Sequence, residues 1–207
     1  MNDNTRNQTP LLVGIAGGSA SGKSTFVRTL TQQVAAAAPA LVIQTISSDR
    51  YFHRDRAKIP LYTSPAFQTE LPDFNHPDAL DIAQLLADLD GILAGDTPPD
   101  VILLEGHLLF HYVALRERLD LRIFIDLDGE TRALRRMVRN LAHPGDPIPD
   151  HSAQSIANYY LESAREGYRR FIEPTRAFAD LIVNGDGDFQ RTAALIAPII
   201  LANTKPG

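Results

Sequence analysis

The sequence predicts an α/β fold with a doubly wound sheet of five parallel strands. Short apolar runs recur along the 207-residue chain, and they are apolar throughout instead of alternating with polar residues. Each run is followed by a segment with helical periodicity or by a turn that leads into one. Strands that are apolar on both faces and separated by helices are typical of a parallel sheet covered on both sides.

Five apolar runs are the candidate strands. The first is rich in branched residues and stops at Gly17-Gly18, as a buried strand entering a turn does. The five runs cover residues 11–16, 41–46, 101–104, 121–125 and 181–183.

The clearest predicted helix covers residues 82–93. Its apolar residues fall at i, i+3, i+4, i+7, i+10 and i+11 from Ile82, which gives the helix one apolar face. Pro77 suits the first turn and Gly95 suits the end. Further helices are expected over residues 23–37, 111–119, 130–141, 152–172 and 189–201. Residues 54–74 form the one long irregular stretch, and a loop of that length is usually functional.

Composition indicates one ordinary globular domain, expected over residues 10–202 with frayed ends at 1–9 and 203–207. Hydrophobic residues make up 44% and charged residues 22%, with a net charge of -5. This charge provides no general basic field, so nucleic acid is not an expected partner. The absence of cysteine excludes disulfides, a thiol nucleophile and a cysteine zinc site, and it fits the cytoplasm. No apolar run is long enough for a membrane span, the start lacks a signal peptide, and a homo-oligomer is left open.

A phosphate-binding loop follows the first predicted strand. The pattern G-x-x-x-x-G-K-[ST] lies between a strand and a helix, where backbone N–H groups and the helix N-terminus would surround phosphates. Lys23 would reach the outer phosphates, and the Ser24 hydroxyl would bind Mg²⁺. The candidate nucleotide-binding residues are Gly17, Gly18, Ser19, Ala20, Ser21, Gly22, Lys23, Ser24 and Thr25. A glycine-rich turn that matches by accident is the alternative, and the flanking strand and helix disfavour it.

Polar residues end three other predicted strands. Ligands bind at the carboxyl ends of strands in an open parallel sheet, so Asp49, Glu105 and Asn184 should border the same site. Phosphoryl transfer needs charge neutralisation, in-line positioning and a group that deprotonates the acceptor. We assign Asp49 to deprotonation of the acceptor hydroxyl and Glu105 to the magnesium shell. The sequence also allows the two residues to have the opposite roles. Taken singly, each residue would be better explained as a helix cap or an exposed strand end, and only together with the phosphate-binding loop do the three favour a functional site.

Four arginines lie on one face of the predicted helix 130–141. Arg132, Arg135, Arg136 and Arg139 are spaced i, i+3, i+4 and i+7, and only Glu130 is near them in sequence. A solvated charged face is the usual explanation of such a stripe. Because neutralising acids are missing nearby, we favour a cluster that stabilises charge on a transferring phosphoryl group.

The histidines show no metal-ligand spacing, and we expect most of them on the surface or in loops. Aromatic residues near the strand ends and in the long loop could stack on a planar substrate or pack in the core. Tyr51, Phe52, Phe67, Phe74, Phe110 and Tyr112 are these residues.

Several segments together resemble the uridine kinase and phosphoribulokinase-like group of P-loop kinases. The resemblance runs from Gly14 to about Gly187 and rests on the loop at 14–25, the segment Ser48-Asp49-Arg50-Tyr51-Phe52, and residues 74–81, 104–106 and 171–180. It implies a nucleoside-monophosphate-kinase-like fold, ATP with Mg²⁺ as donor, and a hydroxyl on a nucleoside-like small molecule as acceptor.

The resemblance also implies roles for individual residues. Asp49 would be the catalytic aspartate, with Lys23, Glu105 and Arg136 assisting, and Ser24, Glu105 and Asp49 would hold the metal. A lid around residues 132–150 would close over the phosphates, with Arg132 and Arg136 facing ATP, and Asn184 would complete the nucleotide site. The acceptor would contact Asp49, Tyr51, Phe52, Asn75, His76, His107 and Arg139.

Three departures from the family pattern bear on the acceptor. Only four residues separate Gly95 from Asp100, where the family places a substrate-holding hairpin. Asn75 replaces an aspartate that holds the sugar diol, and no arginine follows Arg139 in the lid. The loop 54–74, together with residues 107–112, is the candidate for replacing the hairpin.

Two alternatives are kept beside uridine kinase. One is a nicotinamide riboside kinase or another small-alcohol kinase, since such kinases have a comparable segment at Glu105 to Phe110. The other, from a different class, is a regulatory ATP-binding protein with no small acceptor. Asn-Lys-x-Asp, the base-reading motif of switch GTPases, is absent from the sequence.

Overall fold

A sheet of five parallel strands forms the centre of the protein in a computed structural model, which describes residues 9–145 and 147–204. The strand order is β2-β5-β1-β6-β7. The chain therefore adds β2 and β5 on one side of β1 and then β6 and β7 on the other side. The strands are β1 (Leu11–Gly17), β2 (Ile43–Ser47), β5 (Val101–Glu105), β6 (Leu121–Asp126) and β7 (Leu181–Asn184). The predicted fold class and all five predicted strands are confirmed, with ends shifted by one or two residues.

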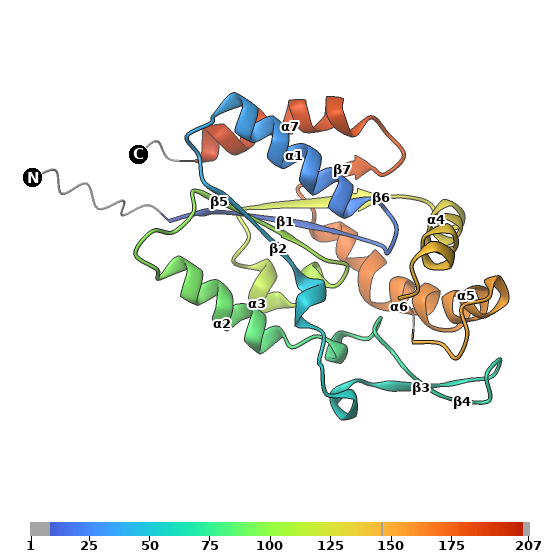
Figure 1. Ribbon diagram of the computed structural model, residues 1–207. Coiled ribbons are helices and arrows are strands. Elements are labelled where there is room, and N and C mark those ends of the chain that lie inside the picture. Colours follow the sequence, from blue (N-terminus) through green and yellow to red (C-terminus); the bar gives the residue numbers. More distant parts are fainter. Residues whose placement is uncertain (1–8, 146, 205–207) are drawn as a thin grey trace, which may run out of the picture.

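Helices cover both faces of this sheet (Figure 1). On one face, α1 (Lys23–Ala37) and α7 (Phe189–Asn203) pack against each other and against the strands. On the other face lie α2 (Ile82–Leu93), α3 (Val113–Arg116) and a 3-10 turn over Leu109–His111. Because both faces are covered, Val13 of the central strand is fully buried on one face and Ala16 on the other, which explains why the strands are apolar throughout.

The register of the strands places the predicted polar positions at one edge. Ile15 pairs with Glu105, and Ser47 pairs with the same residue from the other side. Asp126 pairs with Asn184 at the end of β6. The carboxyl ends of the strands therefore meet next to the turn that follows β1, where a doubly wound sheet binds its ligands.

The segment predicted to be irregular contains an antiparallel hairpin. Residues 54–74 include β3 (Leu61–Ser64) and β4 (Thr69–Pro72), paired from Leu61 with Pro72 to Ser64 with Thr69. Glu162 holds the turn of the hairpin, since its carboxylate accepts hydrogen bonds from the Ser64 hydroxyl at 2.5 Å and from the Ala66 N–H at 3.0 Å. Prediction missed this hairpin because the contact that fixes it comes from a residue almost a hundred positions away.

The helix predicted at 152–172 alternates between two helix types. Regular turns over α5 (Ala153–Tyr159) and α6 (Arg165–Gly167) are each followed by a π turn, at Tyr160–Ala164 and Tyr168–Ile172. A 3-10 stretch over Glu173–Phe178 then leads to β7. The helix predicted at 111–119 is shorter than expected, whereas α4 (Gly129–Ala142) closely matches its prediction.

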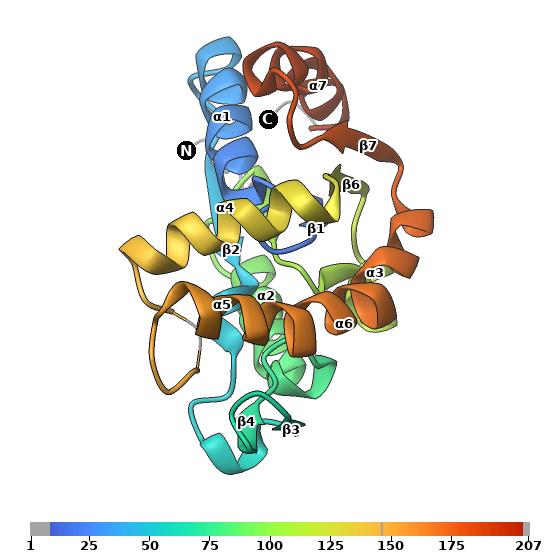
Figure 2. The same cartoon turned by 90° about the vertical axis from the view of Figure 1, so that its right-hand side faces the viewer.

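Helix α4 begins just after β6 and runs alongside α5 and α6, with the hairpin on the far side of them (Figure 2). A small third core joins these elements, in which Leu71 of β4, Ile148, and Ile156 and Tyr159 of α5 pack together. No helix within the described ranges is long and apolar enough to cross a membrane.

The predicted frayed ends are only partly within the described residues, because residues 1–8 and 205–207 lie outside them. At the carboxyl end the prediction is corrected, since α7 continues to Asn203 and the Thr204 N–H donates to Ile200 O at 2.9 Å.

Candidate active site

Residues 17–24 form a tight loop between β1 and α1 that only small residues allow. Gly17 has φ 143°, and a Cβ there would lie 2.4 Å from the Ile125 carbonyl oxygen. Gly22 has φ 99°, and Ala20 also adopts a left-handed conformation with φ 63°. These conformations bring the backbone to the N-terminus of α1, which has the partial positive charge and free N–H groups that attract anions.

Lys23 is half-buried inside this loop. Its Nζ donates to the carbonyl oxygens of Gly17 at 3.0 Å and Gly18 at 2.9 Å. Burial lowers the pKa of Lys23 to about 8, while the carboxylates of Asp49 and Glu105 oppose the shift. A half-buried cation whose hydrogen bonds within the described residues go to neutral carbonyls is suited to receive an anionic group.

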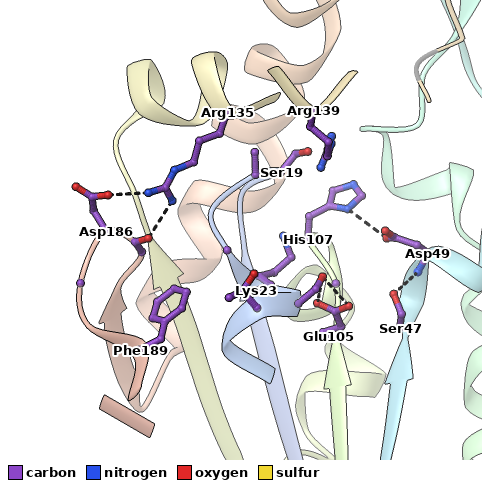
Figure 3. A pocket seen from close by; sticks show the side chains of 17 residues that line it. Ser19, Lys23, Ser47, Asp49, Glu105, His107, Arg135, Arg139, Asp186 and Phe189 are labelled. Atoms are coloured by element: carbon purple, nitrogen blue, oxygen red, sulfur yellow. Dashed lines mark hydrogen bonds and ion pairs between the residues drawn. The ribbon is translucent and has the colours of Figure 1, made fainter. Parts of the chain in front are cut away.

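Ser24 and Glu105 meet at the edge of the loop. The Ser24 hydroxyl is 2.9 Å from each carboxylate oxygen of Glu105 (Figure 3). A hydroxyl and a carboxylate at this distance supply oxygen ligands of the kind that Mg²⁺ uses, with phosphates and water completing the shell. In the described part of the chain no cluster of three or more His, Cys, Asp or Glu side chains could hold a metal alone, so these two residues fit a metal that arrives with a phosphate.

Asp49 lies just beyond β2 and faces His107. The Asp49 carboxylate is 69% exposed, and its Oδ1 lies 4.0 Å from His107 Nδ1. His107 Nε2 is 3.3 Å from the Phe74 carbonyl oxygen, which can only accept, so Nε2 has the proton. Burial lowers the pKa of His107 to about 4, and the ring is neutral near pH 7. Nδ1 therefore presents a lone pair toward the space beside Asp49.

Two clefts meet at Asp49. The first, which we call the loop cleft, has a volume of about 630 Å³ and includes Lys23, Ser24 and Glu105 in its wall. The second, which we call the aromatic cleft, has a volume of about 490 Å³ and includes Phe52, Phe74 and Tyr159. Ser19, Asp49, His107 and Arg139 line both. Asp49 is thus placed between an anion-binding loop and a cavity that has aromatic rings in its wall.

Rings in contact with one another form one wall of the aromatic cleft. The Phe52 ring lies edge-on to Phe74 at 5.3 Å and tilted against His107 at 5.8 Å. Asn75 is 5% exposed at the base of the cleft. Five of the predicted acceptor residues are therefore brought together, although they come from four separate segments of the chain: Asp49, Phe52, Asn75, His107 and Arg139.

Two other predicted acceptor residues point away from both clefts. The Tyr51 hydroxyl donates to Asp88 of α2 at 3.0 Å, and the His76 ring packs on Phe171 at 5.1 Å. Asn184 does not line the loop cleft either. Its Oδ1 accepts a hydrogen bond from the Asp186 N–H at 2.9 Å, and this bond shapes the turn after β7.

The arginines at the loop cleft are not the predicted pair, Arg132 and Arg136. Arg135 and Arg139 line it, whereas Arg132 packs beneath Gly18 with its guanidinium 3.6 Å from the centre of the Tyr168 ring. Arg136 lines the aromatic cleft. The four-residue stripe therefore divides between support of the loop and the walls of both clefts.

The sequence analysis missed the part of the loop-cleft wall that is formed by the turn after β7, residues 185–189. Arg135 donates to Gly185 O at 3.0 Å and to Asp186 Oδ1 at 2.6 Å, so the acid that neutralises the stripe comes from a distant segment (Figure 3). Phe189 lies beside Gly22 and packs edge-on against Phe26 at 5.4 Å. The run Gly185-Asp186-Gly187 before a helix was the available signal for this second turn at the strand ends.

A phosphate loop that ends on a lysine, a serine–carboxylate pair and an aspartate facing a second cleft define a P-loop kinase with a hydroxyl acceptor. Solved structures show the same fold. A putative fructose transport system kinase from Silicibacter sp. TM1040 matches with a TM-score of 0.60 and 21% identity, covering 86% of this chain and 91% of that chain. Shikimate kinase from Acinetobacter baumannii matches with a TM-score of 0.52 and 16% identity, covering 96% and 97%.

Sequence comparison gives the family. Residues 68–190 match the model of the Phosphoribulokinase / Uridine kinase family. The uridine kinase of Chloroflexus aggregans is 35% identical over 199 residues, 86% of this chain and 88% of that protein. The uridine kinase of Ligilactobacillus salivarius is 30% identical over 207 residues, 89% and 90%. The chain belongs to this family, as predicted, and is an ATP-dependent phosphotransferase.

Proposed function

We propose that this kinase phosphorylates the primary hydroxyl of a nucleoside, with uridine as the first candidate. The observation that supports this most is the position of Asp49 where the loop cleft and the aromatic cleft meet. A nucleoside has a planar base that would fit against Phe52 and Phe74 and a hydroxyl that would reach Asp49. The names of the related uridine kinases support the same acceptor.

We propose the following division of work for the transfer. The loop N–H groups and Lys23 hold the outer phosphates, and Lys23 offsets negative charge as it develops. Asp49 accepts the proton of the acceptor hydroxyl as the hydroxyl oxygen bonds to the γ-phosphorus. The bond from that phosphorus to the bridging oxygen breaks, and ADP leaves.

Ser24 and Glu105 would hold Mg²⁺, with Asp49 close to the same shell. The ion, when bound, neutralises phosphate charge and helps to align the donor. Glu105 stands at the end of β5, and its carboxylate accepts the hydrogen bond of the Ser24 hydroxyl. The two residues are therefore close enough to bind the same ion. We therefore keep Asp49 as the base and Glu105 as the metal ligand.

Helix α4 and the residues up to 150 would act as a lid within a single kinase domain. Arg135 joins α4 to the turn after β7, and Arg139 lies over the point where the clefts meet. Residue 146 of the proposed lid lies outside the described residues. ATP as the donor also fits the cytoplasmic location expected from the sequence.

The test is a direct phosphorylation assay against uridine, cytidine, nicotinamide riboside and simple sugars, with each product identified by mass. We expect ATP consumption to depend strongly on a nucleoside and to yield its monophosphate. If no acceptor raised the rate of ATP turnover above the rate measured without an acceptor, the result would instead support a regulatory ATP-binding protein. Turnover with a sugar alone would contradict the nucleoside assignment.

A further inference from the structure

The layer formed by α1 and α7 has an outer surface that is free of charge over most of its length. Residues 29–48 and 192–204 contain no Asp, Glu, Lys, Arg or His, although 22% of the whole chain is charged. These residues include the later turns of both helices, which pack side by side through buried residues such as Leu30 and Ile196. We call the surface that they form together the uncharged face.

Helix α7 is apolar on the side that faces solvent as well as on the side that faces the core. Residues 193–202 are apolar without interruption, and Ile196 and Ile200 are buried against the sheet. On the outer side, Leu195 is 67% exposed and Ile199 is 40% exposed. A helix that is apolar all round is normally covered all round. The outward side of α7 therefore lacks a partner that its sequence predicts.

The uncharged face is open within the described chain. Both views show α1 and α7 as the outermost layer on their side of the sheet, with no other element of residues 9–145 and 147–204 on their outer side (Figures 1 and 2). Two helices of 15 residues, each about 22 Å long and about 10 Å apart, present a face of roughly 400 Å². Exposed apolar patches of this size mark interaction sites.

The uncharged face lies away from the catalytic clefts. Helix α1 begins at Lys23 in the phosphate loop, so Ala36 is about 20 Å further along the helix. Helix α7 also begins beside the loop, where Phe189 lies next to Gly22, and Leu195 belongs to a later turn. A partner on this face would leave the loop cleft and the aromatic cleft open.

The absence of charge favours a second copy of the chain as the partner. In a two-fold contact the residues near the axis meet their own copies, so any charge there faces a like charge. The net charge of -5 opposes self-association through an ordinary part of the surface. The uncharged face avoids this repulsion, and the cores of protein interfaces are likewise depleted of charged residues.

A second exposed apolar stripe, on α4, fits self-association less well. It consists of Leu134, Val138 and Leu141. Arg135 and Arg139 are part of the same short helix, and in a two-fold contact the arginines of the two copies would approach one another. This stripe is therefore the natural comparison for the uncharged face.

From these observations we infer that two copies of the chain associate through the uncharged face, with Leu195 and Ile199 near the two-fold axis. An interface of this size is at the low end for specific protein contacts, so the dimer should be weak and should depend on protein concentration. The inference goes beyond the proposed function and does not depend on which acceptor the kinase uses.

The test is sedimentation velocity of the whole protein at rising concentration, where we expect a shift from monomer to dimer. Leu195→Lys places two ammonium groups across the axis and should raise the Kd of the dimer by about 100-fold, because like charges at an interface cost several kcal/mol. Leu134→Lys is the matched control, since Leu134 is 65% exposed on α4. It should leave the Kd unchanged within about twofold.

Cross-linking tests the same contact without adding charge. The chain has no cysteine, so Ala194→Cys introduces a single thiol beside Leu195. A short bismaleimide should join two copies of this variant into a covalent dimer. Ala87→Cys, at an exposed position of α2 on the opposite side of the sheet, is the control and should stay monomeric under the same treatment.

Three results would overturn the inference. A chain that stays monomeric at every concentration does so, whatever else the face then binds. A dimer that Leu134→Lys weakens and Leu195→Lys does not would place the contact on α4, and equal cross-linking of Ala87→Cys and Ala194→Cys would show no preferred face. Thermal unfolding of each variant identifies a folding defect, and if Leu195→Lys does not fold, Ile199→Lys replaces it. Kinase assays on the same samples keep the two proposals apart, since the dimer is expected even if no nucleoside is phosphorylated.

Discussion

Lys23 is a cation that the protein holds by two neutral carbonyls until an anion arrives. Its burial makes the charge costly, as the lowered pKa of about 8 indicates. Phosphates in the loop would give this cation an anionic partner, and a hydrogen bond between two opposite charges is worth more than one from a cation to a neutral carbonyl. The residue therefore contributes more to binding and transfer than to the stability of the empty protein.

We expect Lys23→Ala to lower kcat by about 100- to 1,000-fold, the range found when a group that stabilises developing negative charge is removed. The unfolding temperature should change little or rise. Steady-state kinetics and thermal unfolding measure the two effects, with Lys58→Ala in the exposed 3-10 turn Arg56–Lys58 as the matched control. A near-normal rate in Lys23→Ala would remove the loop from the mechanism.

Asp49 has an exposed carboxylate at the junction of the clefts, as a group that must reach a substrate proton requires. Asp49→Asn keeps the size of the side chain and removes its basicity. We expect a loss of about 100- to 10,000-fold in kcat, with ATP affinity unchanged. Asp55→Asn, which alters an exposed aspartate that caps a nearby turn, serves as control. If only the KM of the acceptor moved, Asp49 would be a binding residue and Glu105 the better base.

At the scale of elements, a clamp between Arg122 and Asp180 attaches β7 to the edge of the sheet. The guanidinium donates to the two oxygens of Asp180 at 2.7 and 3.1 Å, and the Arg122 backbone N–H donates to Oδ2 at 2.8 Å. The side-chain hydrogen bond from Arg122 is the main reason that the pKa of Asp180 lies below its usual value.

The clamp predicts a pH dependence of stability. Because the pKa of Asp180 is lower in the folded than in the unfolded state, its contribution is present above the ordinary pKa of about 3.9 and is lost as the pH falls through the lowered value. Asp180→Asn should cost about 1 kcal/mol at pH 7, a figure kept small because the pair is partly exposed. Denaturant unfolding at pH 7 and at about pH 3 should show the difference shrinking. The control Asp96→Asn should show none, and a constant difference in Asp180→Asn would contradict the clamp.

Elements defined by local pattern could be predicted from the sequence, and elements defined by remote contacts could not. The helix 23–37 was predicted with its observed bounds, and the apolar periodicity from Ile82 located α2. The hairpin was missed because β3 and β4 have mixed exposure and depend on Glu162. The alternation of α and π turns was missed because no local pattern indicates it, and this helix contacts the remote residues Asn75 and His76.

Across the whole molecule, some residues of the site could also be predicted from the sequence, whereas others depend on contacts between remote segments. Lys23, Ser24, Asp49 and Glu105 could be located because strand ends converge in a parallel sheet. Which arginines face a cleft could not, because a stripe at i, i+3, i+4 and i+7 is narrow and the sequence does not give the rotation of α4. The partner of Arg135 is Asp186, at the far edge of the sheet, and no local signal connects the two.

The contact of Arg135 with Asp186 and Gly185 connects α4 to the turn after β7 and so joins the proposed lid to the sheet. We expect Arg135→Ala to raise the KM for ATP by about 3- to 10-fold, a moderate effect because the ion pair is exposed. Stability should change by less than about 0.5 kcal/mol. Arg191→Ala, an exposed arginine of α7, is the control. An unchanged KM in Arg135→Ala would show that α4 does not contribute to ATP binding through this residue.

The central claim is that ATP binds with its outer phosphates in the loop after β1 and its γ-phosphate directed at Asp49. A crystal structure with Mg²⁺ and a non-hydrolysable ATP analogue tests this most directly. We expect the terminal phosphates within hydrogen-bond distance of the backbone N–H groups of residues 18–24 and of Lys23 Nζ, with the γ-phosphate beside the aromatic cleft. A triphosphate bound elsewhere, or one whose terminal phosphate points away from Asp49, would contradict it.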